Sequence, residues 1–371
     1  MECAERRPGR PALGRAWVSV VGAWLVLGLL GSAPRASEAA VVATYRFNDT
    51  LTADEPGALA LGAVDPLGAA LFETADVFGQ SRRVYRFDGN SSPVNQQAGL
   101  VLATAELTSP TTYSVEAVFA FDGTSDYRRV LDVENRASDS GIYVNPDGHL
   151  ELFADDDTLA TGTTPFTSGF HHVVLVVAAD TVRVYLDGAL EFAVASGAMN
   201  LDNPNNPQHL LNFFLDNVTG GGQGEFTDGR IALIRLHDGA LTGGEVVQLF
   251  HEVQGLPSLT VALSDTAFPL GGTLTLTAEL TPGTTPANVD AYIVVQLPGG
   301  EFVSVLLEGP VPDVVPIAST FVPSVMSGQV LAYTFTGLEP SGTYTVLAGL
   351  THPGTLDVIG VIQQASFSFA P

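Results

Sequence analysis

Few of the residues that could do chemistry in this sequence have the spacing that a catalytic or metal site requires. The seven histidines are scattered apart from His171 and His172, and adjacent strand residues point to opposite faces. A structural role is therefore expected for this pair. The run Asp155 to Asp157 lacks EF-hand spacing and is typical of an exposed turn. Gly220 to Gly224 is rich in glycine, but no helix is expected to begin there and hold a phosphate.

The segment 202–224 carries the polar side chains best suited to contact a ligand. Asparagine and aspartate can hydrogen-bond the hydroxyl groups of a sugar, although the same residues also build turns. The candidates are Asn205, Asn206, Asn212, Asp216 and Asn217. Sugar-binding sites often use a tryptophan as a stacking surface, but both tryptophans, Trp17 and Trp24, lie near the N-terminus. The tyrosines at 45, 85, 113 and 185 lie in strand patterns and are expected in the core.

Residues 1–39 predict a secretory signal peptide. Four arginines lie among the first 15 residues, residues 16–31 are apolar and uncharged, and small residues surround Ala39. The apolar run is shorter than the about 20 residues that a membrane-spanning helix needs. We therefore expect a protein that is secreted or held at the cell surface, with no membrane insertion after cleavage.

The chain that cleavage would leave is strongly acidic. Its 332 residues contain 10 arginines, no lysine and 37 acidic side chains. Such a surface repels phosphate backbones and anionic lipids, so no nucleic-acid partner is expected. The acidity favours solubility and would also suit a calcium-rich exterior. The only cysteine, Cys3, lies in the signal, so neither a disulfide nor a cysteine-bound metal is expected. The sequence does not specify an oligomeric state.

Short β-strands are predicted from residue 41 onward. The run 113–121 alternates between two faces, and 171–177 is apolar; such runs are bounded by Gly, Asp, Asn or Pro. Asp187-Gly188 predicts a two-residue hairpin turn. The length allows two domains, which we place at 40–255 and 256–371. About seven short strands in the second domain predict an immunoglobulin-like sandwich.

A turn, a strand and a capped helix are predicted in succession near residue 240. Asp228-Gly229 forms a turn pair, and 231–236 is an almost unbroken apolar run, as expected of a strand covered on both faces. Thr242 and Glu245 have capping-box spacing, in which each side chain accepts from the backbone N–H of the other. A short helix over about 243–253 should follow.

Three segments in this order resemble the laminin-G-like domains of the concanavalin A-like jelly-roll superfamily. Tyr85 to Asn90 is similar to the family's Leu-x-Phe-Asp-Gly strand end. The segment from Phe170 to Gly188 is similar to its Trp-His-His-Val … Tyr-x-Asp-Gly hairpin, with Phe170 in place of tryptophan. The C-terminal signature is matched at Gly229, Ile231, Arg235, Ala240, Leu241, Thr242 and Glu245. The resemblance covers about residues 41–255 and implies an all-β fold, a jelly-roll sandwich followed by the immunoglobulin-like one.

The resemblance also implies a calcium ion at the rim of the sandwich, since members of the family commonly bind one there. Calcium takes six to eight oxygen ligands from carboxylates, carbonyls and water. The positions that would supply them are Asp49, Asp54, Asp88 and Asp228. Ala232 stands where the family often has aspartate, which is a departure from its pattern.

Retaining glycosidases of this superfamily carry an E-x-D-x-E cluster on one strand. The nearest match is Val130 to Glu134, in which Asp132 and Glu134 have the spacing but Val130 occupies the nucleophile position. This absence argues against that hydrolase class, and we expect two solvated acids beside Arg128 and Arg129.

These observations predict a secreted, non-enzymatic binding or adhesion protein. The laminin-G-like domain would recognise a glycan or an extracellular protein through its loops, with calcium as a candidate cofactor. One alternative is a polysaccharide-active enzyme with an atypical site. A second alternative is a structural component of a surface or matrix.

Overall fold

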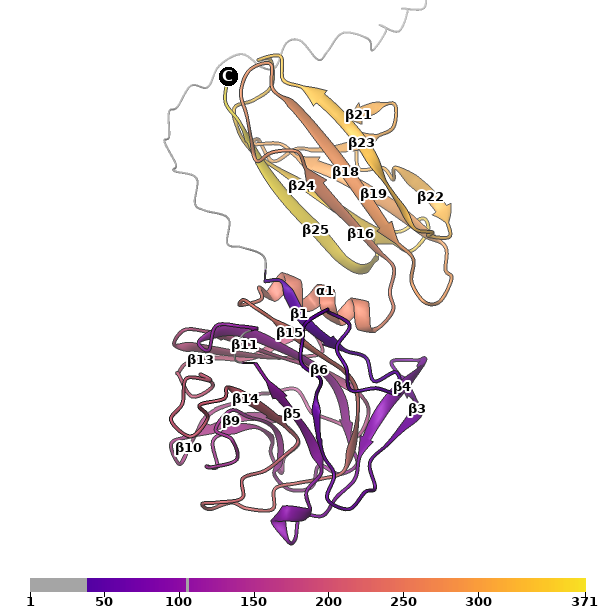
Figure 1. The fold of residues 1–371 in the computed structure, drawn as a ribbon. Helices are drawn as coiled ribbons and strands as arrows, with labels where there is room; N and C mark the ends of the chain where they lie inside the picture. Colours follow the sequence, from indigo (N-terminus) through magenta and orange to yellow (C-terminus); the bar gives the residue numbers. More distant parts are fainter. Residues whose placement is uncertain (1–38, 105–106) are drawn as a thin grey trace, which may run out of the picture. The chain divides into compact units, whose positions relative to one another are not determined.

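The computed structural model describes residues 39–104 and 107–371 (Figure 1). The expected signal peptide lies almost wholly outside these residues, so it stays a prediction. Of the described residues, 39–257 with 283–285 form one compact unit, and 258–282 with 286–371 form a second. No helix in the described part of the chain is long and apolar enough to cross a membrane.

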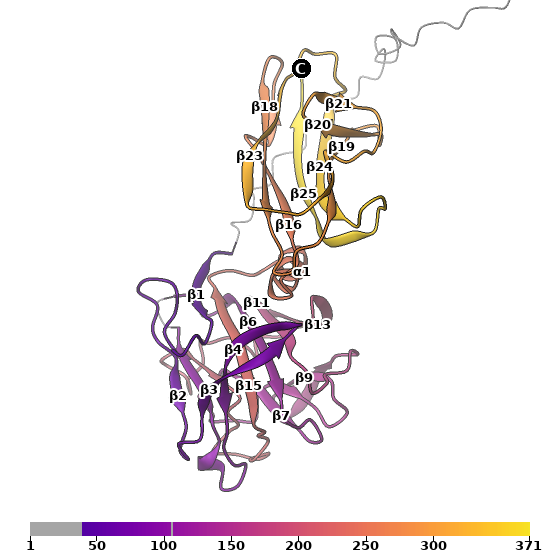
Figure 2. The same ribbon diagram turned by 90° about the vertical axis from the view of Figure 1, so that its right-hand side faces the viewer.

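The first unit is a sandwich of two sheets, which face each other in Figures 1 and 2. In the larger sheet, here called sheet A, β1 also pairs with β15. The order of its other strands is β13 (Ala189–Ala195), β12 (Thr181–Leu186), β11 (His171–Ala178), β6 (Thr112–Phe121), β15 (Gly229–His237), β4 (Gln80–Phe87) and β3 (Leu71–Val77), and β1 spans Val41–Tyr45.

The second sheet, sheet B, is antiparallel throughout. Its strands run in the order β10 (Asp157–Thr161), β9 (Leu150–Ala154), β8 (Gly141–Val144), β7 (Arg128–Asp132), β14 (Leu210–Phe213), β5 (Gly99–Ala103) and β2 (Gly62–Val64). A 3-10 turn, η1 (Val94–Gln96), precedes β5.

Aromatic rings from both layers fill the core between the sheets. Phe87 of β4 stacks on Phe214, with 4.3 Å between ring centroids, and Phe119 and Phe121 of β6 contact the same ring. The alternation predicted for 113–121 is confirmed, because its odd-numbered residues face this core. The concanavalin A-like jelly roll expected from the sequence is therefore confirmed.

Strand β15 is the central element of sheet A, and all its residues except Arg230 are buried. It pairs with β6 on one side and with β4 and β1 on the other. The helix α1 (Gly243–Val253) follows and begins with the predicted capping box, which is confirmed. Its Glu245 Oε2 accepts from Thr242 N at 2.6 Å. The predicted hairpin is also confirmed, with positive φ at Asp187 and Gly188 between β12 and β13.

The second unit also contains two sheets. Each of the seven strands expected from the sequence has a counterpart, and three short ones are added. The immunoglobulin-like topology itself stays a prediction. One sheet has the order β16 (Ser258–Leu263), β18 (Thr273–Thr281) and β23 (Met326–Thr334). The other has the order β17 (Ala267–Phe268), β25 (Val358–Phe369), β24 (Gly342–Thr351), β19 (Val289–Gln296), β20 (Phe302–Leu306) and β21 (Gly309–Val311), with β22 (Ala318–Phe321) on β19.

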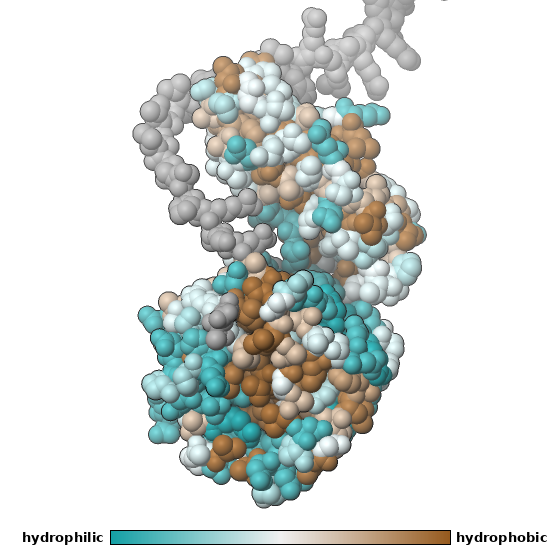
Figure 3. All heavy atoms as spheres, viewed as in Figure 1, coloured by the Kyte–Doolittle hydropathy of each residue, from teal (hydrophilic) through white to brown (hydrophobic). Residues whose placement is uncertain are grey.

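Hydrophobic side chains reach the surface of both units, and on the face of the first unit seen in Figure 3 they lie together in a band. The most exposed in the described chain are Leu307 and Val325, each with 78% of its surface accessible. Both lie in the second unit. Isolated exposed hydrophobic residues are ordinary on soluble proteins and assign no function.

Candidate functional site

The outer face of sheet B carries polar side chains that are nevertheless buried. Arg129 of β7 pairs across the sheet with Tyr143 of β8, which in turn pairs with Glu151 of β9. On the other side of β7, Asp132 pairs with Asn212 of β14. These side chains are buried because the loops after β7 and β14 lie over this face.

Arg129 is the centre of this polar layer, and its side chain is fully buried. Its guanidinium nitrogens each lie 3.1 Å from a carboxylate oxygen, of Asp132, Asp139 and Asp216 respectively. The guanidinium carbon also lies 4.6 Å from the centroid of the Tyr143 ring, a cation–π contact. A buried arginine with such partners fixes the loops that carry them.

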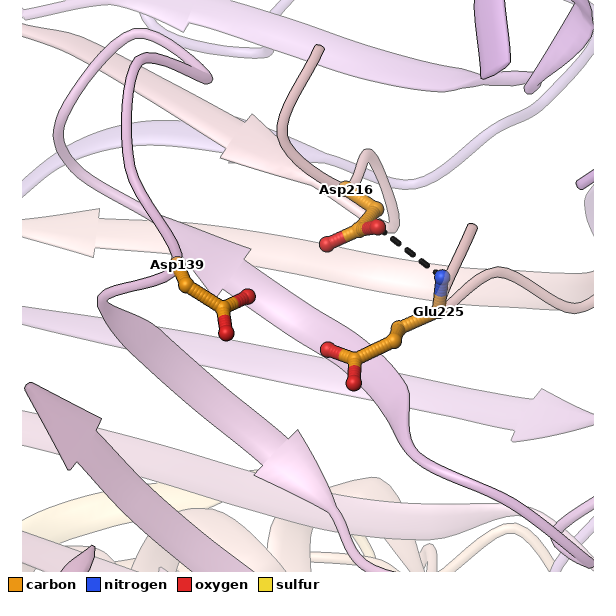
Figure 4. Close-up of side chains that lie close together, drawn as sticks. All are labelled: Asp139, Asp216 and Glu225. Atoms are coloured by element: carbon orange, nitrogen blue, oxygen red, sulfur yellow. Dashed lines mark hydrogen bonds between the residues drawn. The ribbon is translucent and has the colours of Figure 1, made fainter. Parts of the chain in front are cut away.

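Three acids from two loops converge, as Figure 4 shows. Asp139 lies in the loop after β7, and Asp216 and Glu225 both lie in the loop between β14 and β15. One carboxylate oxygen of each lies within 4.8 Å of the others, and we call these residues the acidic cluster. Asp216 Oδ2 accepts from the backbone N–H groups of Gly224 at 2.7 Å and Glu225 at 2.9 Å.

The acidic cluster opens to solvent at one end. Asp216 is fully buried, whereas the Asp139 side chain is 25% exposed and Glu225 is half-buried. Gly222 of the glycine-rich segment packs on Asp139, has φ +69°, and leaves no room for a Cβ. The expected rim loop at 220–224 is thus one wall of the cluster, and glycine is required there by both space and backbone conformation.

Negative charge is in excess around the cluster. Burial, together with the neighbouring charges of Asp139 and Asp216, raises the pKa of Glu225 to about 8, against the effect of Arg129. Burial likewise raises the pKa of Asp139 and of Asp132. Glu225 therefore keeps its proton near pH 7 unless a cation replaces that proton. Carboxylate oxygens, such as those of Asp139, Asp216 and Glu225, are the ligands that Ca²⁺ prefers.

Tyr127 stands next to this group, just before β7. Its half-buried ring meets the ring of Tyr143 edge to face, with 6.0 Å between centroids. Burial raises the pKa of its hydroxyl, and the charges of Glu151 and Glu225 raise it further. A ring with one accessible side therefore adjoins the acidic cluster. Neither Tyr127 nor the cluster as a whole was identified from the sequence, because Asp139 lies far along the chain from the loop that holds Asp216 and Glu225.

The four positions taken from the family resemblance are not gathered in the described structure. Asp49 pairs with Arg83, Asp54 Oδ2 with Arg46 Nε at 2.8 Å, and Asp88 Oδ2 with Arg86 at 3.3 Å. Asp228 Oδ1 accepts from the Gly89 N–H at 2.9 Å. Within the described residues, no three of these four bring their carboxylates within 4.8 Å of one another. Their role as calcium ligands stays a prediction.

The residues predicted to contact a ligand are mostly turned inward. Asn205 is exposed, whereas Asn206, Asn212, Asp216 and Asn217 are buried. Asn206 Nδ2 donates to the Val133 and Leu210 carbonyls, Asn212 Nδ2 to Asp132 Oδ1, and Asn217 Nδ2 to the Thr219 and Gly221 carbonyls. The buried side chains hold the loops in place, and of the five only Asp216 belongs to the acidic cluster. Direct contact with a ligand stays a prediction for all five.

The glycosidase-like segment differs from expectation in one respect. Asp132 and Glu134 were expected to be solvated acids, which is wrong for Asp132: its side chain is fully buried and paired with that of Arg129. The covering loops exclude water, and Asp132 Oδ1 also accepts from Arg136 N at 2.9 Å. Glu134 accepts from Ser138 and Asn203. Neither acid is therefore free at the surface.

The adjacent histidines have structural partners on opposite sides of sheet A. His171 Nδ1 lies 2.7 Å from Asp187 Oδ2, at the hairpin turn. His172 Nε2 lies 3.1 Å from Glu116 Oε1, and its ring stacks on Phe250 of α1. The two rings therefore point to opposite faces and have separate partners, as expected of adjacent strand residues.

Comparisons with solved structures found weak overall likeness. Domain 4 of the extracellular arabinanase AbnA from Geobacillus stearothermophilus, in complex with arabinotriose, has 18% identity and a TM-score of 0.38, over 56% of this chain and 97% of that one. The binding domain of botulinum neurotoxin serotype D/C has 8% identity and a TM-score of 0.43, over 88% and 93%. A Trypanosoma rangeli sialidase has 18% identity and a TM-score of 0.32, over 45% and 27%. No curated protein matches the chain.

A family comparison is more informative. Residues 94–247 match the laminin G type of the concanavalin A-like lectin/glucanases superfamily. This segment runs from η1 into α1 and includes the acidic cluster. Most of the first unit thus matches a lectin/glucanase-like domain of that superfamily.

Proposed function

We propose that this chain is a secreted, non-enzymatic binding protein whose laminin-G-like domain recognises a glycan at the outer face of sheet B. The observation that carries the proposal is the position of Tyr127 beside the acidic cluster. Concave or loop-lined faces with a few convergent polar groups and one aromatic ring suit a sugar, which has both hydroxyl groups and an apolar C–H face.

The chemistry of each group supports a separate part of this recognition. The accessible side of Tyr127 can stack on the C–H face of a sugar ring. Asp139 and Glu225 offer carboxylate oxygens toward solvent, which accept hydrogen bonds from sugar hydroxyls. The buried Arg129 holds Asp139 and Asp216 at fixed positions, so little ordering of the loops is needed when a ligand binds.

Calcium binding is the second part of the proposal. Asp139, Asp216 and Glu225 would hold the ion, which supplies positive charge and open coordination positions when bound. Arg129 already neutralises part of the cluster, and the raised pKa of Glu225 reflects the charge that remains. The ion would take the place of the proton on Glu225.

Binding to a panel of neutral and acidic oligosaccharides, measured by calorimetry with calcium and again with EDTA, tests the proposal. We expect at least one glycan to bind, and Tyr127→Ala to weaken it at least tenfold. Tyr292→Ala, which removes a part-buried tyrosine from the second unit, is the matched control and should have no effect. If no oligosaccharide in the panel binds and the protein associates with itself, the result would instead support a structural surface component.

A hydrolase is the second candidate, and one observation favours it. Glu225 with a pKa of about 8 beside the ionisable Asp139 is the pairing of a protonated acid with a carboxylate that glycoside hydrolysis uses. Release of reducing ends from the same panel would identify turnover. Turnover that Glu225→Gln abolishes would overturn the non-enzymatic proposal, and its absence at every substrate would support it.

A further inference from the structure

A cavity of about 360 Å³ lies on sheet A, beside the C-terminal end of α1. Its walls come from the end of β1, from β4, from β15 and from α1, all within the first unit. Four arginines line it, namely Arg46, Arg82, Arg83 and Arg235. The described part of the chain has only ten arginines and no lysine, so this is an unusual concentration of positive charge in an acidic protein.

Three of the four guanidinium groups have carboxylate partners, and one does not. Arg46 pairs with Asp54, Arg83 with Asp49, and Arg235 with Glu116 and Glu252. Arg82 has no acidic partner within 4.0 Å among the described residues. Its terminal nitrogen donates instead to two neutral oxygens, the Val253 carbonyl at 2.6 Å and Gln80 Oε1 at 2.9 Å.

Arg82 is therefore the one guanidinium of the cavity without a direct carboxylate partner, and Glu252 on the cavity wall offsets its charge only from a distance. Burial lowers the pKa of Arg82, and the positive charge of Arg46 lowers it further. The Nε atom of Arg83 is buried without a hydrogen-bond acceptor. An anion between these groups would offset the repulsion and supply the acceptors.

We propose that this cavity binds a carboxylated or sulfated monosaccharide unit through its oxyanion. Arg82 and Arg46 supply the charge, and Ser81 and Asn48 add hydrogen-bonding groups. Ala232, Leu233 and Val253 give an apolar wall for the carbon skeleton. A cavity of this volume accepts one sugar unit. The strongly negative remainder of the surface would repel a long polyanion, so the ligand carries its charge in one place.

Calorimetry on the chain at low ionic strength tests this site with sodium glucuronate, sodium sulfate and glucose as probes. We expect glucuronate and sulfate to bind and to compete with each other, and glucose not to bind. Tighter binding of glucuronate than of sulfate would identify a sugar-borne group, and equal binding would identify the free oxyanion; both support the site. Absence of binding by both anions at tens of millimolar, or equal binding of glucose, would overturn it.

Charge-matched variants locate the binding. Arg82→Gln and Arg46→Gln should each weaken glucuronate binding at least tenfold, and Arg46 is half-exposed, so its replacement leaves the core intact. Arg230→Gln removes the same charge from β15 outside the cavity, where Arg230 pairs with Glu73 and Asp122, and should leave binding unchanged. Equal weakening in all three would mean that net charge alone attracts the anion. The result is independent of calcium and of Tyr127, so it stands or fails separately from the glycan site on sheet B.

Discussion

The Nε atom of Arg129 lies 3.1 Å from Oδ1 of Asp216, and neither side chain reaches solvent. The pair joins strand β7 to the loop after β14, two segments more than 80 residues apart in the sequence. Charge pairing, together with hydrogen bonds to the Ser138 and Ser140 carbonyls, holds this part of the outer face in place. The position of the acidic cluster therefore depends on one cation.

Replacement of Arg129 by methionine should be strongly destabilising. The change leaves Asp132 and Asp216 buried without their partner, and such losses lower the free energy of unfolding by roughly 3–5 kcal/mol. Urea denaturation followed by circular dichroism measures the change. Arg230→Met breaks exposed ion pairs instead and should cost less than about 1 kcal/mol. Equal effects of the two substitutions would contradict the central role of Arg129.

Glu225 should make the protein less stable as the pH rises. Its pKa is about 8 in the folded state and near 4.5 in the unfolded state, so the folded state binds more protons between these values. The free energy of unfolding then falls as the pH rises through this window. Thermal melts from pH 5 to 9 in EDTA should show a decline that is shallower in Glu225→Gln. An unchanged slope in the variant would show that Glu225 ionises normally.

Calcium should raise the melting temperature if the acidic cluster binds it. An ion that binds only the folded state, present at 100 times its Kd, stabilises by about 2.7 kcal/mol. Differential scanning calorimetry with calcium and with EDTA measures the shift, and Asp139→Asn should remove it. Asp228→Asn tests the ligand set implied by the family resemblance. If only Asp228→Asn removes the shift, the ion is bound by the ligand set that the family resemblance implies and not by the acidic cluster.

The capping box of α1 should contribute measurably to the stability of the first unit. Thr242→Ala removes the acceptor for the Glu245 N–H and should lower the free energy of unfolding by about 1 kcal/mol. Thr242→Ser keeps the hydroxyl and should change it by only a few tenths of that amount. Chemical denaturation of both variants measures the two free energies of unfolding. An equal decrease in both variants would show that the methyl group of Thr242, and not its hydroxyl, stabilises the unit.

The fold could be predicted from the sequence where short-range patterns carry it. The apolar run at 231–236 predicted strand β15, and the Thr242–Glu245 spacing predicted the helix. Asp187-Gly188 predicted the hairpin. Each of these signals involves residues within a few positions of one another. Such local chemistry is readable without knowledge of the tertiary fold.

The candidate site could not be predicted in the same way. Asp139 comes from one loop and Asp216 and Glu225 from another, and their approach depends on the pairing of β7 with β14 and on the buried Arg129. The sequence also does not show that Asp132 is buried, because its burial depends in part on β14 and the loop after it, which are distant in the chain. Asp216 was identified as a polar residue near a ligand, but its three-dimensional neighbours were not.

The position of β15 also has a consequence for biosynthesis. The first strand, β1, has β15 as its partner in the sheet, and β6 and β4 flank the same strand although it ends only at His237. A nascent chain that has reached residue 220 thus holds three strands with exposed hydrogen-bonding edges. Sheet A cannot be completed before β15 has been synthesised. We therefore expect the first unit to fold slowly, and we expect chains truncated before β15 not to complete the sheet.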